Sequence, residues 1–287
     1  MERLSKSELI FKILAYTLVG IFALLTLYPI VYALSVSISG KSAYEAGLIV
    51  LLPKDITFAA YKYIIFDKDF WISYTNTLFY TVFGTGWSLF ISLTGAYALS
   101  KVKLVGRRKW NFLLVFTMWF SAGMIPLYLN YKEMNVDNRW GMIIAFGIQA
   151  YNVILLRNQF QGIPSEIEEA AIVDGANEFQ VFSKVFVPMS SATVATVTLF
   201  YAISRWNGYY WANLLVNNGE ELPLQVYLRS QIENFQEIID TGQSNLPYAA
   251  DSLIYAIIIC SIIPVLIIYP YIQKYFAKGV NLGGVKG

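Results

Sequence analysis

The sequence predicts an all-α integral membrane protein with about six transmembrane helices. Of its 287 residues, 56% are hydrophobic and 14% are charged, whereas soluble globular domains carry about 25% charged residues. The mean hydropathy is +0.51, and the apolar residues form long blocks separated by polar segments. Such blocks suit membrane-spanning helices, because lipid offers no hydrogen-bond partners to exposed backbone groups.

Each predicted helix is a stretch without Asp, Glu, Lys or Arg, close to the roughly 20 residues that cross a bilayer. The stretches are residues 13–40, 71–100, 110–131, 140–156, 185–204 and 252–273. Three of them begin with tryptophan, which favours the membrane interface. The fourth is short and is expected to include flanking residues, and the fifth is expected to continue through Trp206.

The distribution of lysine and arginine predicts the orientation, because cytoplasmic loops carry an excess of both. The segment 101–109 is rich in basic residues and has no acid, so it is expected to be cytoplasmic, and alternation then places both termini in the cytoplasm. The predicted organisation begins with a cytoplasmic segment 1–12, a first transmembrane helix 13–38 and an extracytoplasmic loop 39–70. A core transmembrane domain 71–276 follows, and it includes a cytoplasmic loop 157–188 and an extracytoplasmic loop 209–250. The chain ends with a cytoplasmic tail 277–287.

Composition excludes several classes of function. Histidine is absent and the single cysteine, Cys260, lies in an apolar run, which excludes imidazole catalysis, histidine or cysteine metal sites and disulfide frameworks. The net charge of +2 without an arginine-rich patch argues against nucleic-acid binding. Gly40-Lys41-Ser42 lacks the earlier glycine of a phosphate-binding loop, since Ser35 stands there. We therefore expect no catalytic residue, no metal ligand and no cofactor bound by this chain.

The loop 157–188 has the pattern of a short helix–turn–helix hairpin. Pro164 suits a first helical turn, and three glutamates follow where the helix dipole favours negative charge. Gly175 suits the end of that helix. A second helix is expected to begin at Asn177, with its apolar side formed by Phe179, Phe182, Val185 and Phe186. Helices that lie on membranes carry Lys and Arg on their polar face, so the acidic hairpin indicates a protein partner.

At this loop the chain resembles the membrane subunits of binding-protein-dependent ABC importers, which carry an EAA motif. The matching residues are Glu169, Ala170, Ala171, Asp174, Gly175, Ala176 and Pro188. The family usually ends the motif with Ile-x-Leu-Pro, where this chain has Val-Phe-Val-Pro. The resemblance implies a type I ABC importer permease fold in which Glu169 contacts an ATPase subunit, Ala170 and Ala171 pack in its groove, Gly175 makes the turn, and Asp174 caps or forms an ion pair.

Shorter matches resemble maltose-type carbohydrate permeases and a branch associated with complex oligosaccharides; they are Ser204-Arg205-Trp206-Asn207, residues 222–229 and the tail 278–287. This resemblance implies a multi-pass permease subunit of an ATP-driven oligosaccharide importer in the bacterial cytoplasmic membrane, which is not itself an enzyme. The implied partners are a second homologous permease in a heterodimer, two ATP-binding subunits that hold ATP and Mg, an extracytoplasmic solute-binding protein and membrane lipid. The loop 209–250 would reach into the solute-binding protein.

Polar side chains inside the predicted spans are costly in lipid and tend to face a cavity or the bundle interior. Amides and aromatic rings suit the hydroxyls and ring faces of sugars. The candidates for a saccharide path are Asn76, Gln149, Asn152, Tyr201, Trp206 and Asn207. For each of them the alternative is a contact with a neighbouring helix.

Small residues recur at every fourth position of the second predicted span, at Gly84, Ser88, Ser92, Ala96 and Ser100. Small residues let helices approach closely in lipid. This stripe predicts close packing, either within the subunit or against a second permease.

An ion-coupled secondary carrier for a small polar solute is the alternative from a different class. Such carriers commonly place charged residues near the middle of the membrane and use discontinuous helices. The six stretches contain no charged residue, and we expect no paired broken helices. An intramembrane enzyme is disfavoured because no nucleophile and base can be paired.

Overall fold

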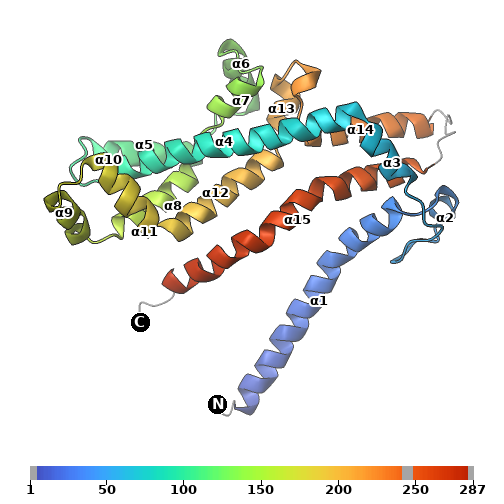
Figure 1. Cartoon of the computed structure of the whole chain (residues 1–287), viewed down its shortest axis with the longest axis horizontal. Coiled ribbons are helices and arrows are strands. Elements are labelled where there is room, and N and C mark those ends of the chain that lie inside the picture. Colours follow the sequence, from blue (N-terminus) through green and yellow to red (C-terminus); the bar gives the residue numbers. More distant parts are fainter. Residues whose placement is uncertain (1–4, 241–247, 284–287) are drawn as a thin grey trace. The chain divides into compact units, whose positions relative to one another are not determined.

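The computed structural model describes residues 5–240 and 248–283, and this part of the chain consists of helices and their connections without a strand. The chain forms two compact units. Unit 1 comprises Met1–Lys68 and Leu228–Ile263, and unit 2 comprises Asp69–Tyr227 and Pro264–Gly287. The helices are labelled in Figure 1.

Unit 1 begins with a long helix and continues with two short ones: α1 (Lys6–Ser37), α2 (Lys41–Glu45) and α3 (Ala59–Phe66). Helix α1 begins before residue 13 because Ser5 and Glu8 form a capping box, in which the Ser5 hydroxyl accepts from the Glu8 N–H at 3.3 Å. The two short helices α2 and α3 lie within the predicted extracytoplasmic loop 39–70. Within this unit the rings of Tyr32 and Tyr255 pack edge to face, with centroids 5.8 Å apart.

Unit 2 holds most of the remaining helices. They are α4 (Lys68–Ser100), α5 (Arg107–Trp119), α6 (Met124–Glu133), α7 (Arg139–Ala145), α8 (Ala150–Gln161), α9 (Ser165–Val173), α10 (Glu178–Val181), a π-helical turn Phe182–Phe186, α11 (Val187–Met189), α12 (Ser191–Trp206), α13 (Tyr210–Leu215) and a 3-10 turn Gly219–Glu221. Two helices continue from one unit into the other: α14 (Leu224–Asp240) and α15 (Ala250–Gly283). Residues 241–247 of the predicted loop 209–250 and 284–287 of the predicted tail lie outside the described residues.

By length and composition, three described helices are suited to cross a membrane: Ser7–Ser37, Lys68–Ser100 and Ala250–Pro270. Three helix pairs also qualify if each counts as one bent span, which gives up to six spans. The bends are 118° between α5 and α6, 49° between α7 and α8, and 85° between Glu178–Met189 and α12. The number of spans agrees with the prediction, but the expectation that no broken helices occur is wrong.

Glycines lie at two of these breaks. Gly123, which precedes α6, has a φ of 86°, a conformation that is costly for any residue with a side chain. Gly147 lies between α7 and α8, and a Cβ there would come within 2.7 Å of the Trp87 ring nitrogen. Hydropathy alone reveals neither feature, because the residues around the breaks stay apolar.

The stripe of small residues on α4 is buried within unit 2. The Ser92 hydroxyl lies 2.6 Å from the Tyr201 hydroxyl of α12, and Ala96 packs in a core cluster with Val197 and Tyr201. Of the two alternatives for the stripe, packing within the subunit is the one that the structure supports.

Candidate functional site

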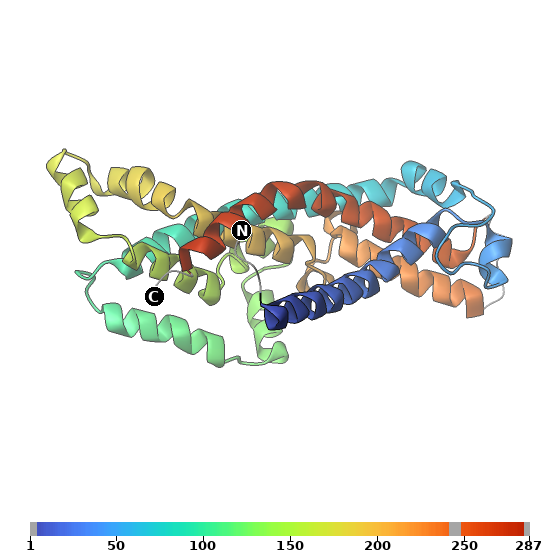
Figure 2. The same ribbon diagram turned by 90° about the horizontal axis from the view of Figure 1, so that it is seen from below.

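The predicted hairpin, residues 164–188, is present. Pro164 precedes α9, and Gly175 follows it with a φ of 85°, so the chain reverses at the predicted glycine. The Ala176 N–H donates to the Ala171 carbonyl at 2.9 Å and closes the turn. Figures 1 and 2 place α9 and α10 at the end of unit 2 where α4 is followed by α5.

The second arm of the hairpin begins where it was predicted. The Asn177 side chain accepts from the Gln180 N–H at 2.9 Å, and the Gln180 side chain accepts from the Asn177 N–H at 2.9 Å. This reciprocal pair satisfies two backbone donors that the start of a helix leaves free. The arm is therefore fixed by local sequence as well as by packing.

The residues of the EAA motif lie on two sides of the hairpin. Glu169, Ala170, Asp174, Gly175 and Pro188 are exposed. Ala171 and Ala176 are half-buried and pack against the core cluster of unit 2. Asp174 stands at the C-cap of α9, where its backbone N–H donates to the Ala170 carbonyl at 3.0 Å.

Two apolar residues of the hairpin are exposed in a way that the sequence analysis did not predict: Val173 was not singled out, and Phe179 was placed on the apolar side. Val173 is 86% exposed and Phe179 is 73% exposed. Phe179 was expected on the apolar side of the second helix, together with Phe182, Val185 and Phe186. In the structure Phe186 is buried, whereas Phe179 is exposed, as are Glu169 and Ala170 of the motif.

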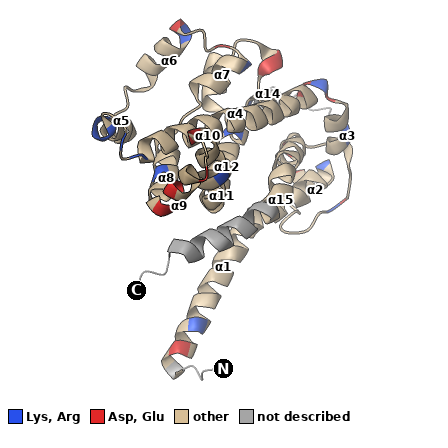
Figure 3. Ribbon diagram, turned by 60° about the vertical axis from the view of Figure 1, so that its left-hand side comes forward, with Lys and Arg blue, Asp and Glu red and all other residues tan. Residues whose placement is uncertain are grey.

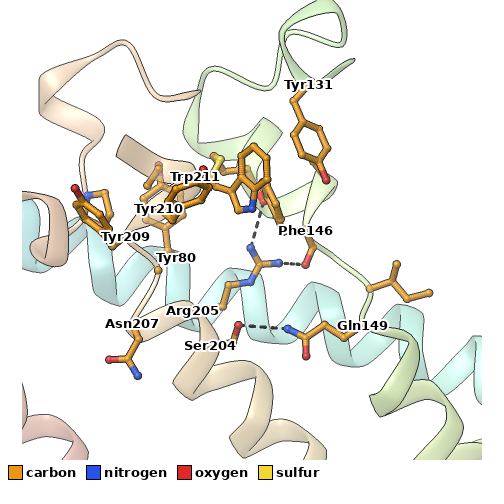
Figure 4. Close-up of a pocket in the computed structure, with 16 residues that line it drawn as sticks. Tyr80, Tyr131, Phe146, Gln149, Ser204, Arg205, Asn207, Tyr209, Tyr210 and Trp211 are labelled. Carbon is orange, nitrogen blue, oxygen red and sulfur yellow. Dashed lines mark hydrogen bonds between the residues drawn. The ribbon is translucent and has the colours of Figure 1, made fainter. Parts of the chain in front are cut away.

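A cavity of about 540 Å³ lies in unit 2 and is shown in Figure 4. Its wall comes from α4, α6, α7, α12 and α13 and from connecting residues, among them Gln149 immediately before α8. The lining residues are Tyr80, Tyr131, Met142, Ala145, Phe146, Ile148, Gln149, Ser204, Arg205, Asn207, Gly208, Tyr209, Tyr210, Trp211, Ala212 and Pro223. Of the six path candidates, Gln149 and Asn207 are among them, and the Gln149 amide donates to the Ser204 hydroxyl at 3.3 Å.

The other four candidates are buried in packing contacts away from the cavity wall. The Asn76 amide donates to the carbonyls of Glu220 and Leu222, at 2.7 and 3.1 Å. The Asn152 amide donates to the side chain of Gln149 at 3.2 Å. Trp206 stacks edge-on against Tyr74, and Tyr201 bonds to Ser92. Tyr201 and Trp206 thus contact neighbouring helices, which was the alternative for each, whereas Asn76 bonds to the 3-10 turn region and Asn152 bonds to the residue that precedes its own helix.

Aromatic residues that the sequence did not single out dominate the cavity. Tyr131 lies edge-on to Trp211, with ring centroids 5.3 Å apart, and also packs on Phe146 at 5.0 Å. Tyr209 and Tyr210 complete the group. The run Tyr-Tyr-Trp at 209–211 is a possible signal in the sequence, but Tyr131 and Phe146 come from distant segments and carry no pattern of their own.

Arg205 is the charged residue of the cavity wall. Its guanidinium donates to the carbonyls of Met142 at 3.2 Å, Ile143 at 3.3 Å and Phe146 at 2.5 Å. These carbonyls belong to the last turn of α7 and the residue after it, where intrahelical donors run out, although that of Met142 also accepts from the Phe146 N–H at 3.4 Å. Ser88 accepts a further bond at 3.2 Å. The guanidinium therefore caps α7 at the break before α8.

Known proteins are similar to this chain in sequence over most of its length. The chain is 38% identical over 282 residues to the polygalacturonan/rhamnogalacturonan transport system permease protein YtcP of Bacillus subtilis, covering 97% of this chain and 99% of that protein. It is 28% identical to the diacetylchitobiose uptake system permease protein DasC of Streptomyces coelicolor, over 83% of this chain and 84% of that protein.

A solved structure is similar over nearly the whole length. It is the crystal structure of a bacterial ABC transporter involved in the import of the acidic polysaccharide alginate, with 48% identity, a TM-score of 0.88 and coverage of 96% of this chain and 100% of that chain. The family model described as the binding-protein-dependent transport system inner membrane component matches residues 1–282. The chain belongs to this family and is a membrane-embedded permease subunit of an ABC importer, in which a separate subunit hydrolyses ATP.

Proposed function

We propose that this permease carries oligosaccharides and that the cavity of unit 2 forms part of their path. The observation that carries the proposal is the wall of aromatic rings with amide and hydroxyl groups around about 540 Å³. That volume lies within the roughly 300–1,000 Å³ of typical ligand pockets, which combine apolar walls with a few polar groups. Aromatic faces match the apolar faces of sugar rings, and amides match their hydroxyls.

The names of the relatives point to saccharides, including acidic ones: polygalacturonan, diacetylchitobiose and alginate. Among the lining residues that the structure describes, Arg205 is the one with a charge, and backbone carbonyls already accept from its guanidinium. The cavity is therefore suited to ring faces and hydroxyl groups more than to carboxylates. We propose that selection for acid groups occurs mainly on the solute-binding protein.

We further propose that the hairpin is the contact for the ATP-binding subunits. Its exposed surface combines Glu169 and Ala170 with the apolar side chains of Val173 and Phe179. An exposed apolar group beside acids favours a protein partner with basic residues. ATP and Mg would be held by that partner. This assignment places the hairpin, residues 1–12 and the tail in the cytoplasm.

Family membership implies a permease partner, an ATPase and a solute-binding protein in general terms. We propose more specifically a heterodimer with a second homologous permease, two ATP-binding subunits, and contact of the segment 209–250 with the solute-binding protein. Broken helices also occur in secondary carriers, so the bends of unit 2 do not separate the two classes of transporter. Membership of the importer family favours ATP-driven transport.

The test is uptake of labelled oligogalacturonate and oligoalginate by cells that express the complete set of subunits. ATP depletion is expected to abolish uptake, and an uncoupler that leaves ATP intact is expected to spare it. Loss of uptake with the uncoupler alone would contradict an ATP-driven importer. Uptake of neither saccharide, with uptake of a non-sugar solute by the same cells, would contradict the proposed cargo.

A further inference from the structure

Four side chains join the end of α4 to the hairpin, and we name them the hairpin clamp: Tyr97, Lys101, Glu168 and Glu178. The Lys101 ammonium lies 2.6 Å from a carboxylate oxygen of Glu168 on α9. The Tyr97 hydroxyl donates to a carboxylate oxygen of Glu178 on α10 at 2.8 Å. Tyr97, in the last turn of α4, and Lys101, immediately after that helix, therefore hold both arms of the hairpin. Figure 3 shows the acidic residues of α9 and α10 in red.

Aromatic rings surround the ammonium of the clamp. Lys101 Nζ lies 4.2 Å from the ring centroid of Tyr97 and 4.3 Å from that of Phe186. The Tyr97 ring also packs on Phe182 and Phe186, with centroids 5.1 and 5.0 Å away. The side chains of Lys101 and Glu168 are only 21% and 25% exposed. Cation–π contacts and ion pairs are stronger when partly shielded from water, whereas exposed pairs contribute little.

The other ion pairs of the described residues serve different purposes. Lys41–Glu45 and Arg229–Glu233 each lie within one helix. Arg139–Glu221 joins the start of α7 to the 3-10 turn. Of these ion pairs in residues 5–240 and 248–283, that of Lys101 and Glu168 is the one that links the hairpin to another part of the chain, the connection that follows α4.

We infer that the hairpin clamp makes α4 move together with the hairpin, so that a displacement of the hairpin reaches the cavity. Helix α4 carries Tyr80 on the cavity wall and Ser88 beside the Arg205 guanidinium. A continuous helix from the clamp to Tyr80 spans about 30 Å at about 1.5 Å per residue. Lys101 and Tyr97 are thus positioning residues for transport, and this inference rests on the proposed contact between the hairpin and the ATPase.

The test measures oligogalacturonate molecules taken up per ATP hydrolysed by the complete transporter in proteoliposomes, with solute-binding protein present. Lys101→Met is expected to lower this ratio at least fivefold, and Lys101→Arg is expected to keep at least half of it. Lys103→Met is the matched control, because Lys103 is an exposed lysine in the same loop. The thermal midpoint of each complex is recorded, because a purely structural role would lower that midpoint and leave the ratio unchanged.

The partner residue gives a second comparison. Glu168→Gln is expected to act like Lys101→Met, whereas Glu133→Gln, at an exposed glutamate at the end of α6, is expected to leave the ratio unchanged. The exchange Lys101→Glu with Glu168→Lys is expected to restore at least part of the ratio. If Lys101→Met prevents assembly, Tyr97→Phe is the variant that tests the inference, because it removes only the hydroxyl. It is expected to lower the ratio about twofold.

The inference would be overturned if the ratio were unchanged in Glu168→Gln and also in Lys101→Met. If Lys101→Met does not assemble, Tyr97→Phe takes its place in this comparison. Phe179→Cys, cross-linked to cysteines in the ATPase groove, separates this failure from failure of the proposed function. No cross-link in the otherwise unaltered complex would contradict the contact between hairpin and ATPase. A cross-link together with unchanged ratios would contradict the clamp alone.

Discussion

Arg205 is a charged side chain at the end of a candidate bent span, and its guanidinium donates to three carbonyls at the end of α7 and to Ser88 of α4. Gly84 of α4 leaves the room for it: a Cβ on Gly84 would lie 2.9 Å from Arg205 Nε. A glycine and an arginine far apart in sequence are therefore needed together to close the break between α7 and α8.

Replacing Gly84 with alanine is expected to displace Arg205 and leave the carbonyls of Ile143 and Phe146 without its N–H donors. A buried polar group left unsatisfied costs about 1–3 kcal/mol, so the thermal midpoint of the purified complex is expected to fall by several degrees. Gly86→Ala is the control, because nothing lies within 4 Å of a Cβ there and alanine favours a helix over glycine by about 1 kcal/mol. Equal midpoints for the two variants would contradict the role of Gly84.

Trp211 is expected to provide a stacking surface for sugar rings in the cavity. Trp211→Leu keeps an apolar side chain but removes the flat face, so uptake of oligogalacturonate at low concentration is expected to fall about tenfold, equivalent to about 1.4 kcal/mol. Trp119→Leu, at a tryptophan of α5 that is 88% exposed, is expected to leave uptake unchanged. Equal uptake by both variants would place the saccharide path elsewhere.

The hairpin shows how an element can be specified by its ends. Pro164 and Gly175 bound α9, and the capping box of Asn177 and Gln180 begins α10. Each of these signals acts over a few residues of chain, so the hairpin could be predicted in place from the sequence. Which of its side chains remain exposed depends on packing against α4 and α8, and for that reason Phe179 was misplaced.

Gly175→Ala is expected to strain the turn of the hairpin, because the φ of 85° costs a residue with a side chain about 1–2 kcal/mol. Nothing lies within 4 Å of a Cβ at Gly175 or at Gly20 of α1, so neither change produces a steric clash. Gly175→Ala is expected to lower ATP-driven uptake at least threefold, and Gly20→Ala is expected to leave it unchanged. Unaltered uptake in both would show that the turn geometry is not required.

At the scale of the whole molecule, the chain lacks the means to hydrolyse ATP and depends on its partners. The purified chain alone is expected to show no ATP hydrolysis and no uptake in proteoliposomes. Addition of the partner permease, the ATPase subunits and the solute-binding protein is expected to restore both. ATP hydrolysis by the chain alone, in a preparation shown by mass spectrometry to be free of the ATPase subunits, would contradict its assignment as a permease subunit.

The sequence by itself determined the helical membrane class, the six apolar stretches and the position of the hairpin. Each of these features depends on hydropathy, charge or helix capping within a short segment. Residues that are close together in the sequence are sufficient to specify it. Only the tertiary structure decided that three of the spans are bent, that Asn76 and Tyr201 pack while Gln149 and Asn207 line a cavity, and that Arg205 caps α7. These features depend on which side chains from distant segments meet, and contacts of that kind leave no periodic pattern along the chain.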